Sequence, residues 1–181
     1  MPYDPPPDLS AMSLAQIAAA VKARRLPPIE SWHPAETIDS GMRIAADGTW
    51  FHNGSPIYRL AMVRAFSTLL MRDDDGQHWL VTPQCRQSVQ VDDAAFIAVE
   101  MQARHGALAF RLNTDELIVA GPDHRLRAAG DPEVPAIYLS VRHGCEARLN
   151  RSTWLQIANH ALAGNDGMHV VSRGARFALV P

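Results

Sequence analysis

Apolar residues near the start of the chain recur at helical spacing. Ser13 and Gln16, at the start of this pattern, are a pair typical of a capping box at a helix N-terminus. We therefore predict an amphipathic helix over residues 9–25, ended by Pro27-Pro28. We expect it to pack on the domain, while a role in docking a partner stays open. The residues that carry the period are Leu14, Ile17, Ala18 and Val21.

From residue 42 onward the pattern changes to short apolar runs bounded by turn residues. Asp47-Gly48 and Asn53-Gly54 are strong hairpin signals, and a second helical pattern covers residues 60–70. Asp73-Asp74-Asp75-Gly76 and His143-Gly144 mark further turns, and Asn150 is placed to cap a helix over 151–162. The predicted strands are 42–45, 49–52, 55–57, 78–82, 88–91, 96–101, 107–112, 117–120, 137–142, 145–149, 168–172 and 176–180.

The order of elements in the last third repeats that of the first. Each copy consists of a hairpin of two strands, then a helix, a turn and a further strand. The hairpin turn is Asn53-Gly54 in the first copy and His143-Gly144 in the second, and the later turn is Asp75-Gly76 or Asp166-Gly167, at an offset of about 90 residues. We therefore predict an α+β fold with two similar β-β-α-β halves, joined by a strand-rich middle. An N-terminal helix is added to them.

The predicted organisation is one compact, two-lobed unit. Residues 1–28 form the amphipathic helix and a Pro-rich arm, residues 29–93 form the first half-motif, and residues 94–181 contain the strand-rich middle and the second half-motif. The length of 181 residues allows one domain or two small ones.

Charge and composition exclude several classes of partner. A net charge of −2 gives no overall field for nucleic acid, and the small arginine excess after residue 141 lacks interleaved aromatic residues. The apolar stretch 11–21 is too short to span a bilayer and has no features of a signal peptide. We therefore expect neither nucleic acid nor a membrane as partner. Cys85 and Cys145 indicate reduced thiols and a cytoplasmic location.

A set of short motifs is spread between about residues 29 and 180: Trp32-His33-Pro34, residues 47–57, 72–76, 79–83 and 91–96, Gly121-Pro122-Asp123-His124 and Asn150-Arg151. Together these stretches resemble the DUF1285 family, a bacterial family of unknown function. The resemblance implies an α+β fold with repeated motifs and a role in signal transduction, and it transfers no catalytic residue. Where the family pattern has proline, this chain has Ala95 and Arg125.

Known catalytic and metal motifs do not fit the chain. Arg142-His143-Gly144 is similar to the histidine phosphatase signature, but fewer than 40 residues follow it and a hairpin turn explains it better. The eight histidines include no His-Glu-x-x-His, and Met71 occupies the first ligand position of a calcium loop at Asp73-Asp74-Asp75. Asp92 and Asp93 are adjacent and point to opposite faces of a strand, which disfavours a catalytic pair. We predict no catalytic residues, no bound metal and no cofactor.

One set of residues is our candidate ligand site. Arginines flank each hairpin-to-helix junction, where free backbone N–H groups and a guanidinium fork suit phosphate or carboxylate. The alternative is that these arginines form ion pairs that hold the halves together. The candidate residues are Arg59, Arg148, Arg151, Asp92, Asp93 and His52.

Three functions remain at this point. The first is a non-enzymatic regulatory or signal-transduction module that binds a small anionic ligand or a partner protein. The second is an enzyme of unrecognised chemistry that acts on a phosphate- or carboxylate-bearing small molecule. The third is a protein-interaction domain that docks through the N-terminal helix. The sequence leaves the oligomeric state open.

Overall fold

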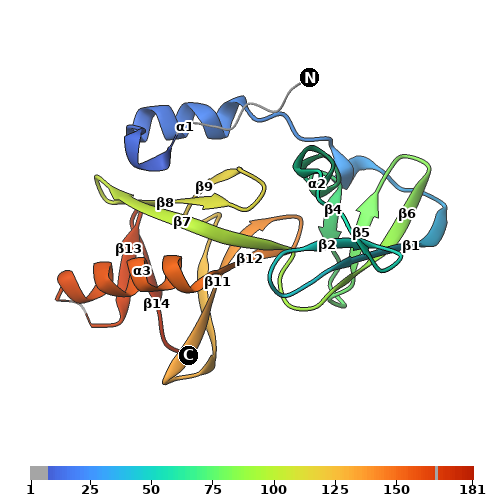
Figure 1. Cartoon of the computed structure of the whole chain (residues 1–181). Coiled ribbons are helices and arrows are strands. Elements are labelled where there is room, and N and C mark those ends of the chain that lie inside the picture. Colours follow the sequence, from blue (N-terminus) through green and yellow to red (C-terminus); the bar gives the residue numbers. More distant parts are fainter. Residues whose placement is uncertain (1–7, 166) are drawn as a thin grey trace. The chain divides into compact units, whose positions relative to one another are not determined.

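The structure is a computed structural model that describes residues 8–165 and 167–181, so the predicted Pro-rich arm at 5–7 and Asp166 lie outside the described residues. The chain divides into two compact units (Figure 1). The N-terminal unit comprises Arg25–Phe96 and Val141–Glu146. The C-terminal unit comprises Ile97–Ser140 and Ala147–Pro181, together with the segment that ends at Arg24.

The N-terminal unit contains a mixed six-stranded sheet in the order β3-β2-β1-β6-β5-β4. β1 pairs with β6 in parallel, whereas the pairs β1–β2, β2–β3, β4–β5 and β5–β6 are antiparallel. One helix, α2, connects the β2–β3 hairpin to the β4–β5 hairpin. The elements are β1 (Glu36–Ile44), β2 (Trp50–His52), β3 (Ser55–Pro56), α2 (Leu60–Ser67), β4 (Leu70–Arg72), β5 (His78–Val81) and β6 (Cys85–Val91), after a short 3₁₀ turn (Ile29–Ser31).

The C-terminal unit contains a second six-stranded sheet, in the order β10-β11-β12-β7-β8-β9, and a separate β13–β14 hairpin. The tip of the β11–β12 hairpin, Val141–Glu146, is the part that groups with the N-terminal unit. The elements are α1 (Leu14–Ala23), β7 (Phe96–Arg104), β8 (Ala107–Leu112), β9 (Leu117–Val119), β10 (Leu126–Asp131), β11 (Val134–Arg142), β12 (Cys145–Leu149), α3 (Arg151–Ala163), β13 (His169–Ser172) and β14 (Ala175–Ala178), with a 3₁₀ turn at Leu9–Ala11.

The predicted α+β fold with two similar halves is confirmed. In each half a hairpin precedes a helix and a second hairpin follows it: β2–β3, α2, β4–β5 and β11–β12, α3, β13–β14. The turns that open the two repeats have the same backbone form, with positive φ at Asn53-Gly54 (48° and 81°) and at His143-Gly144 (48° and 76°). Two consecutive residues with positive φ define the type I′ turn, whose twist matches that of a hairpin.

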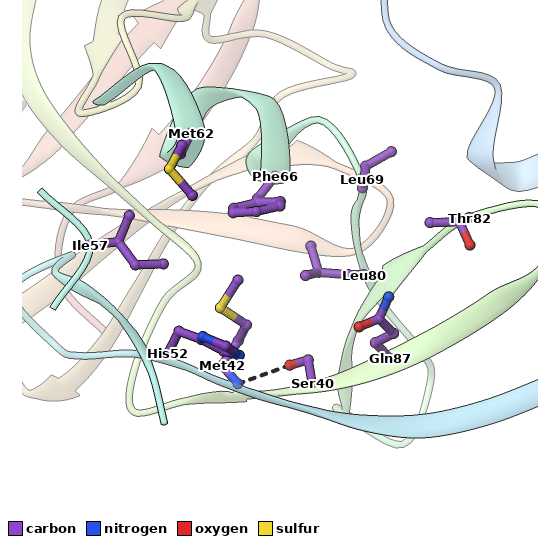
Figure 2. Close-up of a pocket in the computed structure, with 10 residues that line it drawn as sticks. All are labelled: Ser40, Met42, His52, Ile57, Met62, Phe66, Leu69, Leu80, Thr82 and Gln87. Atoms are coloured by element: carbon purple, nitrogen blue, oxygen red, sulfur yellow. Dashed lines mark hydrogen bonds between the residues drawn. The ribbon is translucent and has the colours of Figure 1, made fainter. Parts of the chain in front are cut away.

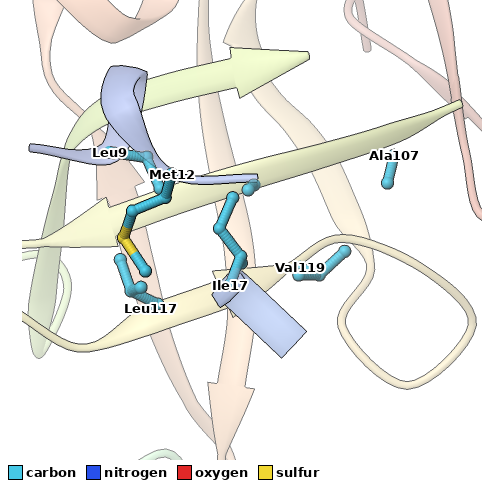
Figure 3. Packing of buried hydrophobic residues seen from close by; sticks show 7 residues of the cluster. Leu9, Met12, Ile17, Ala107, Leu117 and Val119 are labelled. Carbon is cyan, nitrogen blue, oxygen red and sulfur yellow. The ribbon is translucent and has the colours of Figure 1, made fainter. Parts of the chain in front are cut away.

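The N-terminal helix is confirmed in shortened form. Ser13 and Gln16 make the predicted capping box, and the helix that they start ends at Ala23. Leu9, Met12 and Ile17 pack against residues of β8 and β9, including Leu117 and Val119 (Figure 3). Arg24 adds an ion pair with the buried Glu116 at 3.3 Å. The helix thus covers one face of the C-terminal sheet and completes its core.

Several expected boundaries were wrong. The predicted helix over 60–70 ends at Ser67, and Leu70 begins β4. The strand expected at 42–45 begins six residues earlier, at Glu36. Asp131-Pro132-Glu133 does connect two elements, as the turn of the β10–β11 hairpin, but the strand before it, β10, was not predicted.

Candidate functional site

A pocket of about 430 Å³ lies in the N-terminal unit between α2 and one face of its sheet (Figure 2). We call it the α2 pocket. Four strands, α2 and the segments that flank this helix supply its walls. The lining residues are Ser40, Met42, His52, Ile57, Met62, Phe66, Leu69, Leu80, Thr82 and Gln87.

A bulge in β1 shapes the floor of the pocket. Asp39 pairs with Ser88 and Met42 pairs with the next residue of β6, so Ser40 and Gly41 are extra residues on β1. Gly41 has φ +66°, and a Cβ there would lie 2.1 Å from Oδ1 of Asn53. The positive φ therefore favours glycine at this position, and any other residue would also displace the Asn53 side chain. Bulges of this kind redirect side chains and are common beside functional sites.

Apolar side chains dominate the pocket. Six of its ten lining residues are apolar, and Phe66 and Met62 of α2 face Leu80 and Met42 across it (Figure 2). Phe66, Met42 and Leu69 are only half-buried, so apolar surface remains open to the pocket. Trp50 supports the wall from behind, because its buried ring stacks on Phe66 with centroids 6.4 Å apart. Its indole N–H has no hydrogen-bond partner among the residues that the structure describes.

The polar lining residues divide into two kinds. The Ser40 hydroxyl donates to the Ser88 carbonyl and accepts from the Met42 N–H, and the Thr82 hydroxyl makes the same pair of bonds with the backbone of Cys85. These two hydroxyls are occupied by the fold. His52 has only a 3.4 Å contact with the Asn53 amide, and the Gln87 amide donates only a 3.6 Å bond to Cys85 Sγ, among the described residues. His52 and Gln87 are therefore the polar groups available to a ligand.

The structure places the candidate residues in different settings. His52 lines the α2 pocket. Asp92 is held by Arg43, whose Nε and Nη2 donate to the two carboxylate oxygens. The Arg43 bonds hold the pKa of Asp92 below its usual range. Asp93, its neighbour, also has a polar partner. Asp92 is thus engaged by an arginine outside the predicted set.

The predicted arginines flank two helices in different units. Arg59 occupies the N-cap position of α2 and is exposed, and its side chain makes no hydrogen bond or ion pair within the described residues. Arg148 lies two residues before Asn150, the N-cap of α3, and has an interaction partner, whereas Arg151 is the exposed first residue of that helix. A ligand site that joins Arg59 to Arg148 and Arg151 stays a prediction.

The Arg142-His143-Gly144 segment forms the hairpin turn that the sequence favoured. The Arg72 N–H donates to the His143 carbonyl at 2.8 Å, and a Cβ on Gly144 would come within 2.5 Å of the Arg72 carbonyl. Arg142 donates to the Ser67 carbonyl at the end of α2 and lies over the Phe96 ring. Burial lowers the pKa of His143, against the opposing effect of Glu30. These contacts anchor the tip of the hairpin in the N-terminal unit.

The acidic run also behaves as a turn. Asp73 accepts hydrogen bonds from the Trp79 indole at 2.7 Å and from the Gln77 N–H at 2.9 Å. No group of three or more His, Cys, Asp or Glu residues within 8–165 and 167–181 is arranged to hold a metal ion.

Burial raises the pKa of the Cys145 thiol to about 12, which keeps it protonated and unreactive at neutral pH. In the part of the chain that the structure describes, none of the helices has both the length and the apolar character needed to cross a membrane.

The fold and the pocket define the molecule as an α+β protein of two similar halves, in which the α2 pocket belongs to the first half. Comparison with known proteins identifies the family of the chain. The model of the DUF1285 N-terminal domain matches residues 27–94, and that of the DUF1285 C-terminal domain matches residues 95–179. The chain therefore belongs to the DUF1285 family, whose function is unknown.

Two solved structures are similar to the chain. A DUF1285 family protein from Silicibacter pomeroyi DSS-3 is 35% identical, with a TM-score of 0.76 over 94% of this chain and 96% of that one. A second member, from Shewanella baltica OS155, is 22% identical, with a TM-score of 0.54 over 65% of this chain and 90% of that one, and shows the fold alone. No curated protein matches the chain.

Sequence reasoning selected one of the ten lining residues, His52. The other nine lining residues were not predicted, because the periodicity of a strand or helix identifies its buried face but does not show which part of that face is left open to a pocket. Two methionines, Met42 and Met62, were a usable signal, because flexible thioether side chains are common at adaptable binding surfaces.

Proposed function

We propose that the protein is a non-catalytic regulatory module whose N-terminal unit binds a small molecule in the α2 pocket. The observation that carries the proposal is the pocket itself. Its volume of about 430 Å³ falls within the range of small-molecule sites, and its mainly apolar lining with a few polar groups is typical of them. A concave site of this kind favours a small ligand over a protein partner.

The chemistry of the lining supports binding without turnover. A catalytic site needs a nucleophile or a pair of groups that exchange protons within hydrogen-bond reach. The hydroxyls of Ser40 and Thr82 are bonded to backbone groups, and His52 is the one titratable side chain among the ten lining residues. An enzyme that acts on a phosphate- or carboxylate-bearing molecule remains the second candidate function, and turnover of a bound ligand would favour it.

The regulatory part of the proposal rests on α2. This helix carries Met62 and Phe66 in the pocket wall, and its last carbonyl, that of Ser67, accepts a hydrogen bond from Arg142 at 2.9 Å. A ligand that shifts Phe66 therefore acts on the helix that holds the β11–β12 hairpin tip. β11 and β12 continue from this tip into the C-terminal sheet. A ligand-induced shift of the tip would therefore be passed along these two strands to that sheet. We place this module in the cytoplasm, in line with its two free cysteines.

A thermal-shift screen of small acids, nucleotides and apolar metabolite-like compounds tests the proposal. Met62→Trp fills the pocket from α2, where Met62 is 37% exposed, and Leu155→Trp makes the same change on α3, where Leu155 is 47% exposed and lines no part of this pocket. We expect some compounds to raise the Tm of the wild type and of Leu155→Trp, and to have no effect on Met62→Trp.

Recovery of the compound after incubation separates binding from catalysis. We expect mass spectrometry to recover each stabilising compound unchanged. A screen without any stabilising compound, or a Tm shift that survives Met62→Trp, would overturn the proposal. Conversion of the compound to a product would replace it with the enzymatic alternative.

A further inference from the structure

The charge around the α2 pocket selects among the ligands that its apolar walls admit. None of the ten lining residues is acidic. The polar lining groups left without a strong internal partner are His52 and Gln87, and each of them can donate a hydrogen bond. Such a set favours a ligand whose polar end accepts hydrogen bonds.

A cation without a side-chain partner is close in sequence to two of the lining residues. Arg59 lies two residues after Ile57 and three before Met62, and both of these residues line the pocket. Its exposed guanidinium has no partner within the described ranges, in contrast to Arg43, which is held by Asp92. A guanidinium offers a planar pair of N–H donors that matches a carboxylate.

The pocket is also elongated across the sheet. His52 and Gln87 lie on opposite sides of it (Figure 2), and β1 separates their strands. Two strand spacings, roughly 10 Å, therefore lie between β2 and β6. Between these ends the surface is formed by Met42, Phe66 and Leu80. An elongated apolar body fits this space, with its polar group at one end.

We infer that the α2 pocket takes an amphipathic monocarboxylate, with its apolar body against Met42, Phe66 and Leu80 and its carboxylate at His52 and Arg59. This inference rests on the proposed function, since it names the ligand class of the same pocket. His52 donates a hydrogen bond to a carboxylate oxygen, and Arg59 supplies the positive charge. The predictions for His52 and Arg59 as ligand-binding residues are thereby combined in one site within one unit.

Matched ligand series test the inference. Hexanoate, octanoate and decanoate probe the apolar body, and octanamide, octanol and octylamine replace the carboxylate by neutral or cationic groups. Calorimetric titration is expected to show affinity rising about fourfold for each added methylene until the pocket is full. Octanoate is expected to bind at least about tenfold more tightly than octanamide or octylamine, because a hydrogen bond to a charged group is worth more than a neutral one.

Four variants locate the carboxylate. His52→Gln and Arg59→Gln are each expected to weaken octanoate about tenfold while leaving octanol binding unchanged. His33→Gln and Arg25→Gln are the controls, because these exposed residues of the same unit do not line the pocket and are expected to leave all affinities unchanged.

The possible outcomes separate the two proposals. If octanol or octylamine binds as tightly as octanoate and Met62→Trp abolishes the binding, the proposed function stands and the carboxylate inference is overturned. The same holds if the preference for octanoate survives both His52→Gln and Arg59→Gln. If no member of either series binds, and the wider screen also yields no compound that Met62→Trp displaces, the proposed function falls as well.

Discussion

The two halves of the chain share one order of elements but cover their sheets to different degrees. In the C-terminal unit all six residues of β8 and all three of β9 are buried, with α1 packed on them. In the N-terminal unit β6 has one buried residue in seven, and α2 leaves Phe66 and Met42 half-exposed. The C-terminal sheet therefore has a closed apolar face over β8 and β9, whereas the N-terminal sheet keeps an open pocket beneath α2.

The helices show the same difference. α3 spans 13 residues and buries Ile157, Ala158 and Ala161, with Asn150 capping its N-terminus. α2 spans eight residues, buries Val63 and Ser67, and has no side-chain cap. The hairpins that follow also differ, because β4–β5 joins the six-stranded sheet whereas β13–β14 stands as a two-stranded sheet of its own. The helix beside the pocket is thus the shorter and less firmly terminated of the two.

Truncation of one aromatic residue in each half gives the largest predicted contrast. Phe110→Ala in β8 removes a ring that is 0% exposed and should cost about 3–5 kcal/mol of unfolding free energy, through lost burial and a cavity. Phe66→Ala removes a ring that already faces the pocket and should cost roughly 1 kcal/mol. Urea unfolding monitored by circular dichroism measures both. Equal losses would contradict the difference in closure.

Acid should weaken the N-terminal unit first. Burial, reinforced by Arg72, lowers the pKa of His78 from 6.5 to about 4, so the unfolded chain binds this proton more readily than the folded one. The stabilising contribution of neutral His78 is complete above about pH 6.5 and is lost as the pH falls toward about 4. In the other unit burial raises the pKa of Asp115, so protonation there does not oppose folding.

Hydrogen exchange with peptide resolution, corrected for intrinsic rates, distinguishes the units between pH 7 and pH 5. Protection should fall in β5 and β6 before β8 and β9, and His78→Gln should reduce this pH dependence. An equal loss of protection in both units, or an unchanged pH dependence of protection in His78→Gln, would contradict the assignment of this acid sensitivity to His78.

Substituting the N-cap residues of α3 and α2 should have the smallest effect on the free energy of unfolding. Asn150→Ala removes the acceptor for the Thr153 N–H and should destabilise the protein by about 1 kcal/mol. Arg59 already has extended backbone angles (φ −78°, ψ 101°), so Arg59→Ser places an acceptor at an uncapped end and should add about 0.5 kcal/mol or more. Denaturant midpoints measure the two changes, with Arg25→Ser as the control. A loss of stability in Arg59→Ser would show that α2 does not begin at this residue.

Local signals predicted the repeated architecture because they act over a few residues. Asn53-Gly54 and His143-Gly144 specify their turns by chain geometry, and Ser13 with Gln16 specifies a helix start. The strand β8 was predicted with its observed ends, Ala107 and Leu112. Each of these features is determined by residues close together in the sequence.

Features that depend on distant partners were missed or misplaced. Leu70 fits the helical face of Phe66 as well as it fits a strand, and pairing with Leu80 decides in favour of β4. The first part of β1 is exposed and has no alternation, so its parallel pairing with β6 could not be anticipated. The α2 pocket depends on the same parallel pairing and on the two extra residues at Ser40 and Gly41. Arg43 was likewise not foreseen as the partner of Asp92, which lies 49 residues away.

The hairpin tip at Val141–Glu146 has a consequence for how the chain matures during synthesis. The first half cannot complete its packing on Arg72 and Ser67 until residue 146 has left the ribosome, since the Arg142–Ser67 bond spans 75 positions. Conversely, Leu9 and Ile17 must wait for β8 and β9 before they are covered. Contacts of such long sequence separation slow folding and leave apolar surface exposed in the meantime. The two units are therefore interleaved along the chain: the N-terminal unit is complete only once Val141–Glu146 has been synthesised, and the C-terminal unit includes a segment, ending at Arg24, that is synthesised before the N-terminal unit.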